Sequence, residues 1–180
     1  MMWRRLDNPG HEWARLFDLG SGPVLRGTTV FMEEHVLGRL DYKIVCNPLW
    51  ETLSAEVLGW VGEEKFKLRI EKTRGNTWRM NGQAVPRVND CVDIDLSFSP
   101  STNLLPIRRL NLEIGQEAEV RAAWLKFPDL ELHPLVQRFR REGERRYFYD
   151  SDIGFSTNLE VNVDGFVVNY PPLWTEETGE

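Results

Sequence analysis

The stretch Leu53-Ser-Ala-Glu-Val-Leu-Gly-Trp-Val-Gly-Glu-Glu-Lys-Phe-Lys-Leu-Arg-Ile-Glu71 decides the fold class. In its first arm, every second residue from Leu53 to Val61 is small or apolar. In its second arm, three apolar residues alternate with Lys67, Arg69 and Glu71. This period of two is typical of half-buried strands, and the glycine-containing turn at residues 62–64 joins the two arms. The stretch therefore predicts a β-hairpin with one apolar face.

The same alternation recurs along most of the chain. It marks residues 40–46, 118–124, 135–149 and 159–170, and the hairpin signals Asn81-Gly82 and Asp164-Gly165 stand between extended runs. No apolar pattern with a period of 3.6 residues extends over 12 or more positions. We therefore expect an all-β fold, a long antiparallel sheet of about a dozen strands rolled into a β-roll or open barrel with little helix.

Composition limits the class of protein. A chain of 180 residues with 41% hydrophobic and 28% charged residues is expected to form a single domain, here over residues 1–174, with a disordered acidic tail at 175–180. A net charge of −6 argues against nucleic-acid binding. Without a long apolar run or a secretory signal, we expect no integral membrane segment and a cytoplasmic location, with Cys46 and Cys91 as core thiols.

Residues 91–110 concentrate polar chemistry. Asp93 and Asp95 share one face of a predicted strand, a Ser-Pro-Ser-Thr-Asn turn follows at residues 99–103, and Pro106-Ile-Arg-Arg109 comes next. We expect Pro106 to begin a second strand or to lie on a strand at the sheet edge, and a strand here would send Arg108 and Arg109 to opposite faces. One arginine could then pair with Asp93 or Asp95 in a buried network. The same groups could instead recognise a polar ligand or act as a catalytic acid and base.

Within the turn, Thr102 and Asn103 carry short polar side chains, which commonly bond to nearby backbone and shape such loops. Asn103 could instead hold a sugar hydroxyl. Arginines are also dense between residues 138 and 146. This segment predicts a hairpin whose charges either protect a sheet edge or meet an anionic head group or a partner.

The central motif resembles that of a bacterial family described as putative glycolipid-binding proteins. The pattern Cys-x-Asp-x-Asp-Leu followed by Pro-x-Thr-Asn-x-Leu-Pro-Ile-Arg-Arg-Leu is met within residues 91–110, and Trp78, Gly82, Tyr170-Pro171 and Trp174 are further landmarks. The resemblance implies a long antiparallel sheet rolled on itself and an amphiphilic small-molecule ligand, such as a glycolipid.

Two functional hypotheses follow. The first is a non-enzymatic binding or carrier protein for a glycolipid or other amphiphile, with tryptophans lining an apolar cavity. Its candidate ligand-binding residues are Asp93, Asp95, Asn103, Arg108, Arg109, Trp78 and Trp174. The second is a small-glycoside or acyl hydrolase with Asp93 and Asp95 as its acid/base pair. No Cys-x-x-Cys, His-Glu-x-x-His or glycine-rich phosphate motif occurs, so we expect no metal or cofactor. An open sheet edge could support a homodimer.

Overall fold

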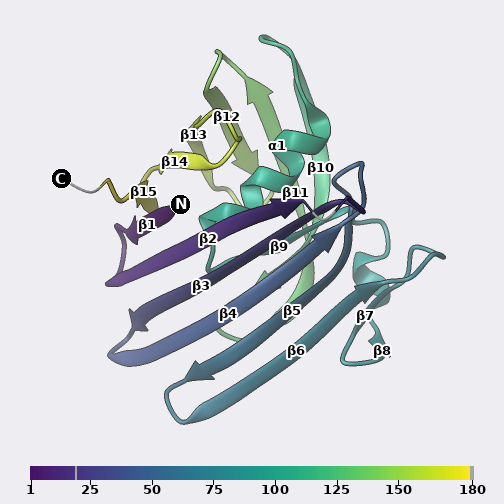
Figure 1. Cartoon of the computed structure of the whole chain (residues 1–180), viewed down its shortest axis with the longest axis vertical. Coiled ribbons are helices and arrows are strands. Elements are labelled where there is room, and N and C mark those ends of the chain that lie inside the picture. Colours follow the sequence, from purple (N-terminus) through teal and green to yellow (C-terminus); the bar gives the residue numbers. More distant parts are fainter. Residues whose placement is uncertain (19, 179–180) are drawn as a thin grey trace.

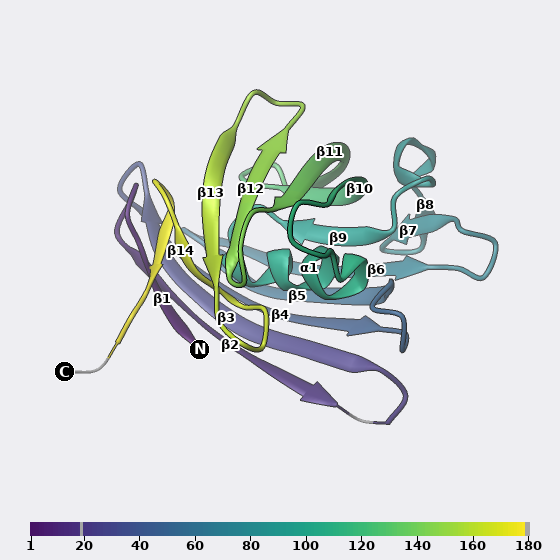
Figure 2. The same cartoon turned by 90° about the horizontal axis from the view of Figure 1, so that it is seen from above.

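The computed structural model describes residues 1–18 and 20–178, and it confirms the predicted all-β fold (Figures 1 and 2). One helix of seven residues and two short 3-10 turns interrupt the strands in this part of the chain. The strands are β1 (Met2–Arg5), β2 (Gly10–Asp18), β3 (Pro23–Glu33), β4 (Val36–Cys46), β5 (Thr52–Val61), β6 (Glu64–Lys72), β7 (Trp78–Met80), β8 (Gln83–Ala84), β9 (Asp93–Leu96), β10 (Glu117–Lys126), β11 (Glu131–Arg141), β12 (Arg146–Ser151), β13 (Ser156–Val161), β14 (Val167–Tyr170) and β15 (Trp174–Glu176). The helix is α1 (Leu104–Leu110), and the 3-10 turns are η1 (Pro86–Val88) and η2 (Pro100–Asn103).

All 15 strands form one sheet, in the order β8-β7-β6-β5-β4-β3-β2-β1-β15-β14-β13-β12-β11-β10-β9. Strands β2 to β8 and strands β15 to β10 make two meanders, which join where β1 pairs with β15. Every pairing is antiparallel except that of β9 with β10, which is parallel because η2 and α1 cross over between those two strands.

The sheet rolls so that its two halves face each other across helix α1 (Figure 2). The backbone N–H of Ile94 on β9 donates to the side-chain hydroxyl of Thr52 on β5 over 3.0 Å, which ties the last strand of the sheet to its opposite half. A packed apolar core fills the space between the two halves. Its largest fully buried side chains include Trp3, Trp78 and Phe139.

The predicted hairpins are confirmed, including the tight turn at Asn81-Gly82. Both turn residues have positive φ angles, of 50° and 82°, as the favoured two-residue hairpin turn requires. Leu53 is an exception to the predicted apolar face of β5. A register shift opposite Val45 and Cys46 turns Leu53 outward, where it is 44% exposed.

The prediction that Pro106 begins a strand is wrong, because residues 104–110 form α1. Leu104 and Ile107 lie one turn apart and are buried, so the segment packs one helical face into the core. Pro106 is tolerated because the first turn of a helix needs no backbone donor. The helix escapes a search for long periodic patterns because it ends after two turns, at Asn111 in the left-handed conformation.

At the C-terminal end, β15 continues to Glu176, two residues beyond the expected end of the domain at Trp174. Residues 179–180 of the predicted tail lie outside the described residues. Cys46 and Cys91 are buried free thiols, as predicted. No helix within the described residues is long and apolar enough to cross a membrane.

Candidate functional site

The centre of the 91–110 motif is an ion pair between β9 and α1. Arg109 Nε lies 3.0 and 3.2 Å from the two carboxylate oxygens of Asp93, and Arg109 Nη2 lies 2.6 Å from Oδ2. Asp93 is 1% exposed, so burial raises the pKa of its carboxyl, while the guanidinium of Arg109 opposes that shift. The predicted pairing of one arginine with one aspartate is therefore confirmed, and it fixes α1 against the sheet.

Asp95, two residues further along β9, has different partners. Its carboxylate accepts a hydrogen bond of 2.7 Å from the side-chain amide of Gln137, and that amide also lies 3.1 Å from the hydroxyl of Tyr149. Burial raises the pKa of Asp95 to about 6, the Gln137 amide opposes this shift, and the charge of Asp93 adds to it. Asp95 is therefore a carboxyl group that titrates close to neutral pH.

Asp95 lies in a cleft of about 190 Å³ with aromatic walls. Tyr170 packs edge to face against both Tyr149 and Phe155, which are tilted relative to each other, and the three ring centroids are 5.9–6.2 Å apart. Trp124 and Trp174 contribute further aromatic surface. The apolar residues Leu135, Ile153 and Leu173 add aliphatic surface, and serines also line the cleft, so one carboxylate stands in a cleft with large aromatic and aliphatic walls.

Asn103 places a second acceptor in the same cleft. Its side-chain nitrogen donates to the carbonyl of Pro100 over 3.2 Å, whereas its oxygen Oδ1 is buried and accepts no hydrogen bond from the described residues. The residue as a whole is only 4% exposed. A buried polar atom without a partner costs about 1–3 kcal/mol, so a ligand hydroxyl that reached Oδ1 would recover part of that cost.

A buried polar cluster adjoins the cleft. Glu12 on β2 accepts hydrogen bonds from the hydroxyls of Tyr42, at 2.6 Å, and Ser99, at 2.7 Å, and Ser99 also lines the cleft. The hydroxyls of Tyr42 and Ser101 lie 2.5 Å apart. Burial raises the pKa of Glu12 to about 8, against the opposing hydrogen bonds, so this carboxyl is largely protonated at neutral pH.

The structure brings only part of the predicted set together. Asp95, Asn103 and Trp174 line one cleft, whereas Trp78 is completely buried and its indole nitrogen donates to the carbonyl of Cys91 over 3.1 Å. Arg108 lies in a separate open groove, with its guanidinium 5.1 Å from the ring centroid of Trp50. The expectation that Arg108 and Arg109 occupy opposite faces of a strand is wrong, since both are on α1.

Thr102 and Asn103 shape the η2 turn as predicted, because the Thr102 hydroxyl donates to the carbonyl of Ser99 and Asn103 bonds to Pro100. The sequence interpretation missed three participants, namely Gln137, Tyr149 and Glu12. The sequence signal that could have identified Gln137 and Glu12 is a polar residue at a position of a strand that otherwise carries apolar, inward-facing residues. Gln137 stands between the buried residues Leu135 and Phe139, and Glu12 occupies an inward position of β2.

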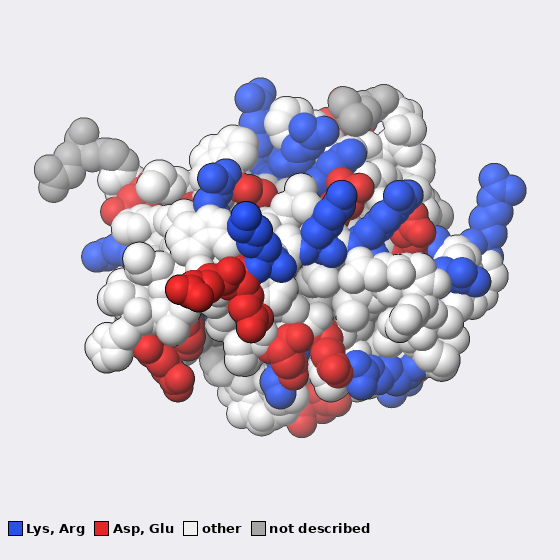
Figure 3. Space-filling view, turned by 90° about the horizontal axis from the view of Figure 1, so that it is seen from below, with Lys and Arg blue, Asp and Glu red and all other residues white. Residues whose placement is uncertain are grey.

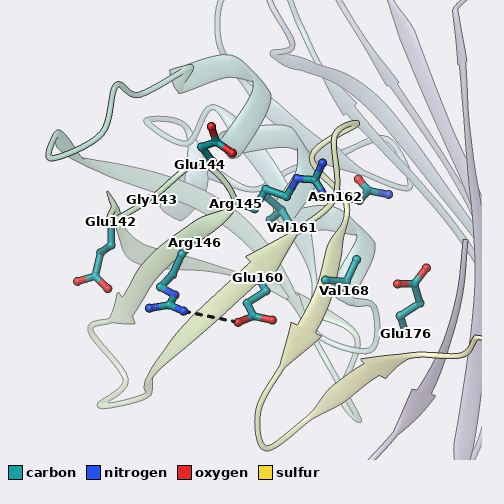
Figure 4. A pocket seen from close by; sticks show the side chains of 10 residues that line it. All are labelled: Glu142, Gly143, Glu144, Arg145, Arg146, Glu160, Val161, Asn162, Val168 and Glu176. Atoms are coloured by element: carbon teal, nitrogen blue, oxygen red, sulfur yellow. Dashed lines mark ion pairs between the residues drawn. The ribbon is translucent and has the colours of Figure 1, made fainter.

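The arginine-rich segment forms the predicted β11–β12 hairpin, but this hairpin does not protect a sheet edge because β10 and β13 flank it. The groove beside it carries charges of both signs (Figure 4). Arg146 lies 4.0 Å from Glu160, and Glu142, Glu144 and Glu176 also line the groove. This balance makes the groove a poor receptor for an anionic head group.

Comparison with known proteins places the chain in a family. A family model described as "Putative glycolipid-binding" matches residues 1–176. The chain belongs to this family. A crystal structure of a DUF1089 family protein from Pseudomonas aeruginosa is similar to this chain, with 29% sequence identity, a TM-score of 0.81 and 92% of each chain covered. No curated protein matches the chain. Among the described residues, no group of three or more His, Cys, Asp or Glu side chains could hold a metal ion.

Proposed function

We propose that the protein is a non-enzymatic carrier of a glycolipid or another amphiphilic glycoside, and that the cleft at Asp95 binds one sugar ring of that ligand. The unpartnered acceptor Asn103 Oδ1, placed beside Asp95 in an aromatic cleft, is the observation that carries this proposal. The description of the family supports the same class of ligand.

The chemistry of the cleft suits a sugar. Sugar hydroxyls are donors, and the Asp95 carboxylate and Asn103 Oδ1 are acceptors with free capacity. The apolar face of a sugar ring can lie against aromatic side chains such as Trp174 or Tyr170, which offer large rigid surfaces. A hydrogen bond to a charged acceptor contributes about 1.5–3 kcal/mol and a neutral one about 0.5–1.5 kcal/mol, so Asp95 should contribute more than Asn103.

The size of the cleft limits what enters it. A volume of about 190 Å³ is below the roughly 300–1,000 Å³ of sites that enclose a drug-sized ligand. We therefore place one ring inside and an attached acyl or alkyl chain outside. The aliphatic residues Ile153, which is 59% exposed, and Leu173 give that chain an apolar surface.

The remaining candidate residues take indirect roles in this proposal. Asp93 and Arg109 hold α1 and thereby position Asn103 at its N-terminal end, and Trp78 fills the core. A cytoplasmic location and a homodimer formed through the sheet edges β8 and β9 stay predictions. Light scattering coupled to gel filtration tests the second of these.

Hydrolysis is the alternative, and the raised pKa of Asp95, about 6, is the observation in its favour. A two-carboxylate mechanism also needs a second free acid facing the same substrate. Arg109 holds Asp93 in an ion pair, and the lining of the cleft includes Asp95 but not Asp93. We therefore prefer binding to turnover.

Calorimetric titration with octyl glucoside, below its micelle-forming concentration, tests the proposal, with octanol as the chain-only ligand. We expect Asn103→Leu to weaken glucoside binding about 3- to 10-fold and Asp95→Asn about 10- to 100-fold, without affecting octanol. Asp129→Asn, an exposed charge removal outside the cleft, is the matched control. Equal affinity for octanol and the glucoside, or unchanged affinity in both cleft variants, contradicts sugar recognition. Release of free octanol from the glucoside by wild-type protein, abolished in Asp95→Asn, establishes the hydrolase instead.

A further inference from the structure

The outer face of strands β2–β6, defined by their alternate residues that point away from the core, is unusually basic for this acidic chain. These positions carry seven Lys or Arg side chains and three carboxylates, a local net charge of +4 on a chain of net charge −6. Figure 3 shows that Lys and Arg side chains gather across the upper part of that view, whereas several Asp and Glu side chains lie below them.

The cations follow the strand register. Arg15 on β2 pairs in register with Arg26 on β3, and Arg26 pairs with Lys43 on β4. Lys65 and Lys67 stand two residues apart on β6, and within the described part of the chain neither has a carboxylate within ion-pair distance. Like charges directly opposite each other destabilise a sheet. Glu56 on β5 lies opposite Lys43 and offsets part of this repulsion, whereas Arg15 and Arg26 face each other, so an external anion would stabilise this pair.

The same face also exposes large apolar side chains. Trp13, Val30, Leu58 and Trp60 are 39–46% exposed and are interleaved with the cations. Trp60 also lines a shallow groove of about 360 Å³ with Leu37 and Val30. Exposed apolar clusters of this kind on a soluble surface mark a contact with another apolar phase or partner.

We propose that the outer face of β2–β6 docks on an anionic lipid surface. The register places Trp13 and Trp60 where their amphipathic rings can enter the headgroup layer, and the cations of β6 against lipid phosphates. The proposal goes beyond sugar binding in the cleft and rests on different residues, so either can fail without the other.

Charge and side-chain type distinguish this partner from two others. A second copy of the chain packed face to face would bring two surfaces of +4 together, which repel. A nucleic acid would also attract the cations, but the aliphatic side chains Val30 and Leu58 offer neither stacking planes nor hydrogen bonds to bases. An anionic bilayer satisfies both the cations and the aliphatic groups.

The test is cosedimentation of the full chain with vesicles made of equal parts phosphatidylglycerol and phosphatidylcholine, compared with pure phosphatidylcholine vesicles, none containing glycolipid. A triple variant, Lys65→Gln, Lys67→Gln and Arg69→Gln, should weaken binding to the anionic vesicles by about 100-fold, or roughly fivefold for each cation. The matched control, Arg138→Gln, Arg140→Gln and Arg146→Gln, removes the same charge from the other half of the sheet and should leave binding unchanged.

A second variant, Trp13→Ser with Trp60→Ser, tests the apolar part. We expect it to weaken vesicle binding about tenfold or more, including at high salt, where the cations no longer contribute. All positions are exposed, and circular dichroism checks that each variant is folded. The proposal is overturned by equal binding to neutral vesicles, by an equal loss in the control, or by no vesicle binding. Binding of duplex DNA without vesicle binding, or a dimer lost in the tryptophan variant, also overturns it by assigning the face to another partner.

Discussion

Replacing Arg109 with methionine tests the buried ion pair that holds α1 to the sheet. The change keeps most of the aliphatic stem but removes three nitrogen–oxygen contacts of 2.6–3.2 Å to Asp93. Asp93 is 1% exposed and would keep a buried carboxylate without a cation. Breaking such a pair costs about 3–5 kcal/mol, a large share of the roughly 5–15 kcal/mol that stabilises a typical domain.

The assay is urea unfolding followed by tryptophan fluorescence, with Arg108→Met as the matched control one residue away. Arg108 makes no ion pair within the described residues and stacks over Trp50, a contact that contributes about 0.5–1 kcal/mol, so Arg108→Met should lower the free energy of unfolding several times less than Arg109→Met. Asp93→Asn combined with Arg109→Met should recover part of the lost free energy of unfolding, because no unpaired charge is then buried.

The pH dependence of the stability of Arg109→Met is the strictest test of the buried ion pair. Without Arg109 the pKa of Asp93 rises further, so the folded variant binds a proton more readily than the unfolded chain does. The stability deficit of Arg109→Met should therefore be largest near neutral pH and should shrink as the pH falls towards 4. A deficit that is the same at every pH, or no larger than that of Arg108→Met, would refute the role of the buried charge pair.

Three further predictions concern titratable groups whose pKa is raised by burial. The pKa of Asp95 is about 6, so the protein should bind octyl glucoside more tightly as the pH rises from 5 to 7.5. Calorimetry should find that the affinity of the Asp95→Asn variant does not depend on pH in this range. A variant with the same pH dependence as the wild type would contradict this prediction. Glu12 has a folded pKa of about 8, above its unfolded value, so wild-type stability should fall by up to about 1.4 kcal/mol per pH unit between pH 5 and 8. Glu12→Gln should flatten that slope in urea titrations, and an equally steep slope would show that another group titrates. Burial raises the pKa of Cys46 to about 12 and of Cys91 to about 11. Neither thiol should therefore react with iodoacetamide at pH 8 until urea unfolds the protein. Rapid labelling of the folded chain would contradict their burial.

Many of the strands were predictable from sequence because they carry their own local signal, whereas β1 to β3 and β15 were not predicted individually. Alternating side chains identify β4 to β6 and β10 to β14, and turns such as Asn81-Gly82 are determined by the residues they contain. Helix α1 was not predictable in the same way. Two turns of helix carry too few positions to establish a 3.6-residue period, and tertiary burial of Leu104 and Ile107 decides their conformation.

The cleft depends on contacts between distant parts of the chain. Asp95 meets Gln137 over 42 residues of sequence, and Glu12 meets Ser99 over 87. The ion pair of Asp93 and Arg109 was foreseeable because a short crossover joins its partners. The separation of Arg108 from Asp95 was not foreseeable, because residues 104–110 were predicted to form a strand and form helix α1 instead.

The most direct test of sugar binding is a crystal structure of the protein with octyl glucoside. We expect the glucose ring inside the cleft, with hydroxyls within hydrogen-bonding distance of Asp95 and Asn103 Oδ1, and with the octyl chain leaving past Ile153. A ring bound in the groove of Arg108 and Trp50, or an octyl chain that enters the cleft ahead of the sugar, would contradict this assignment.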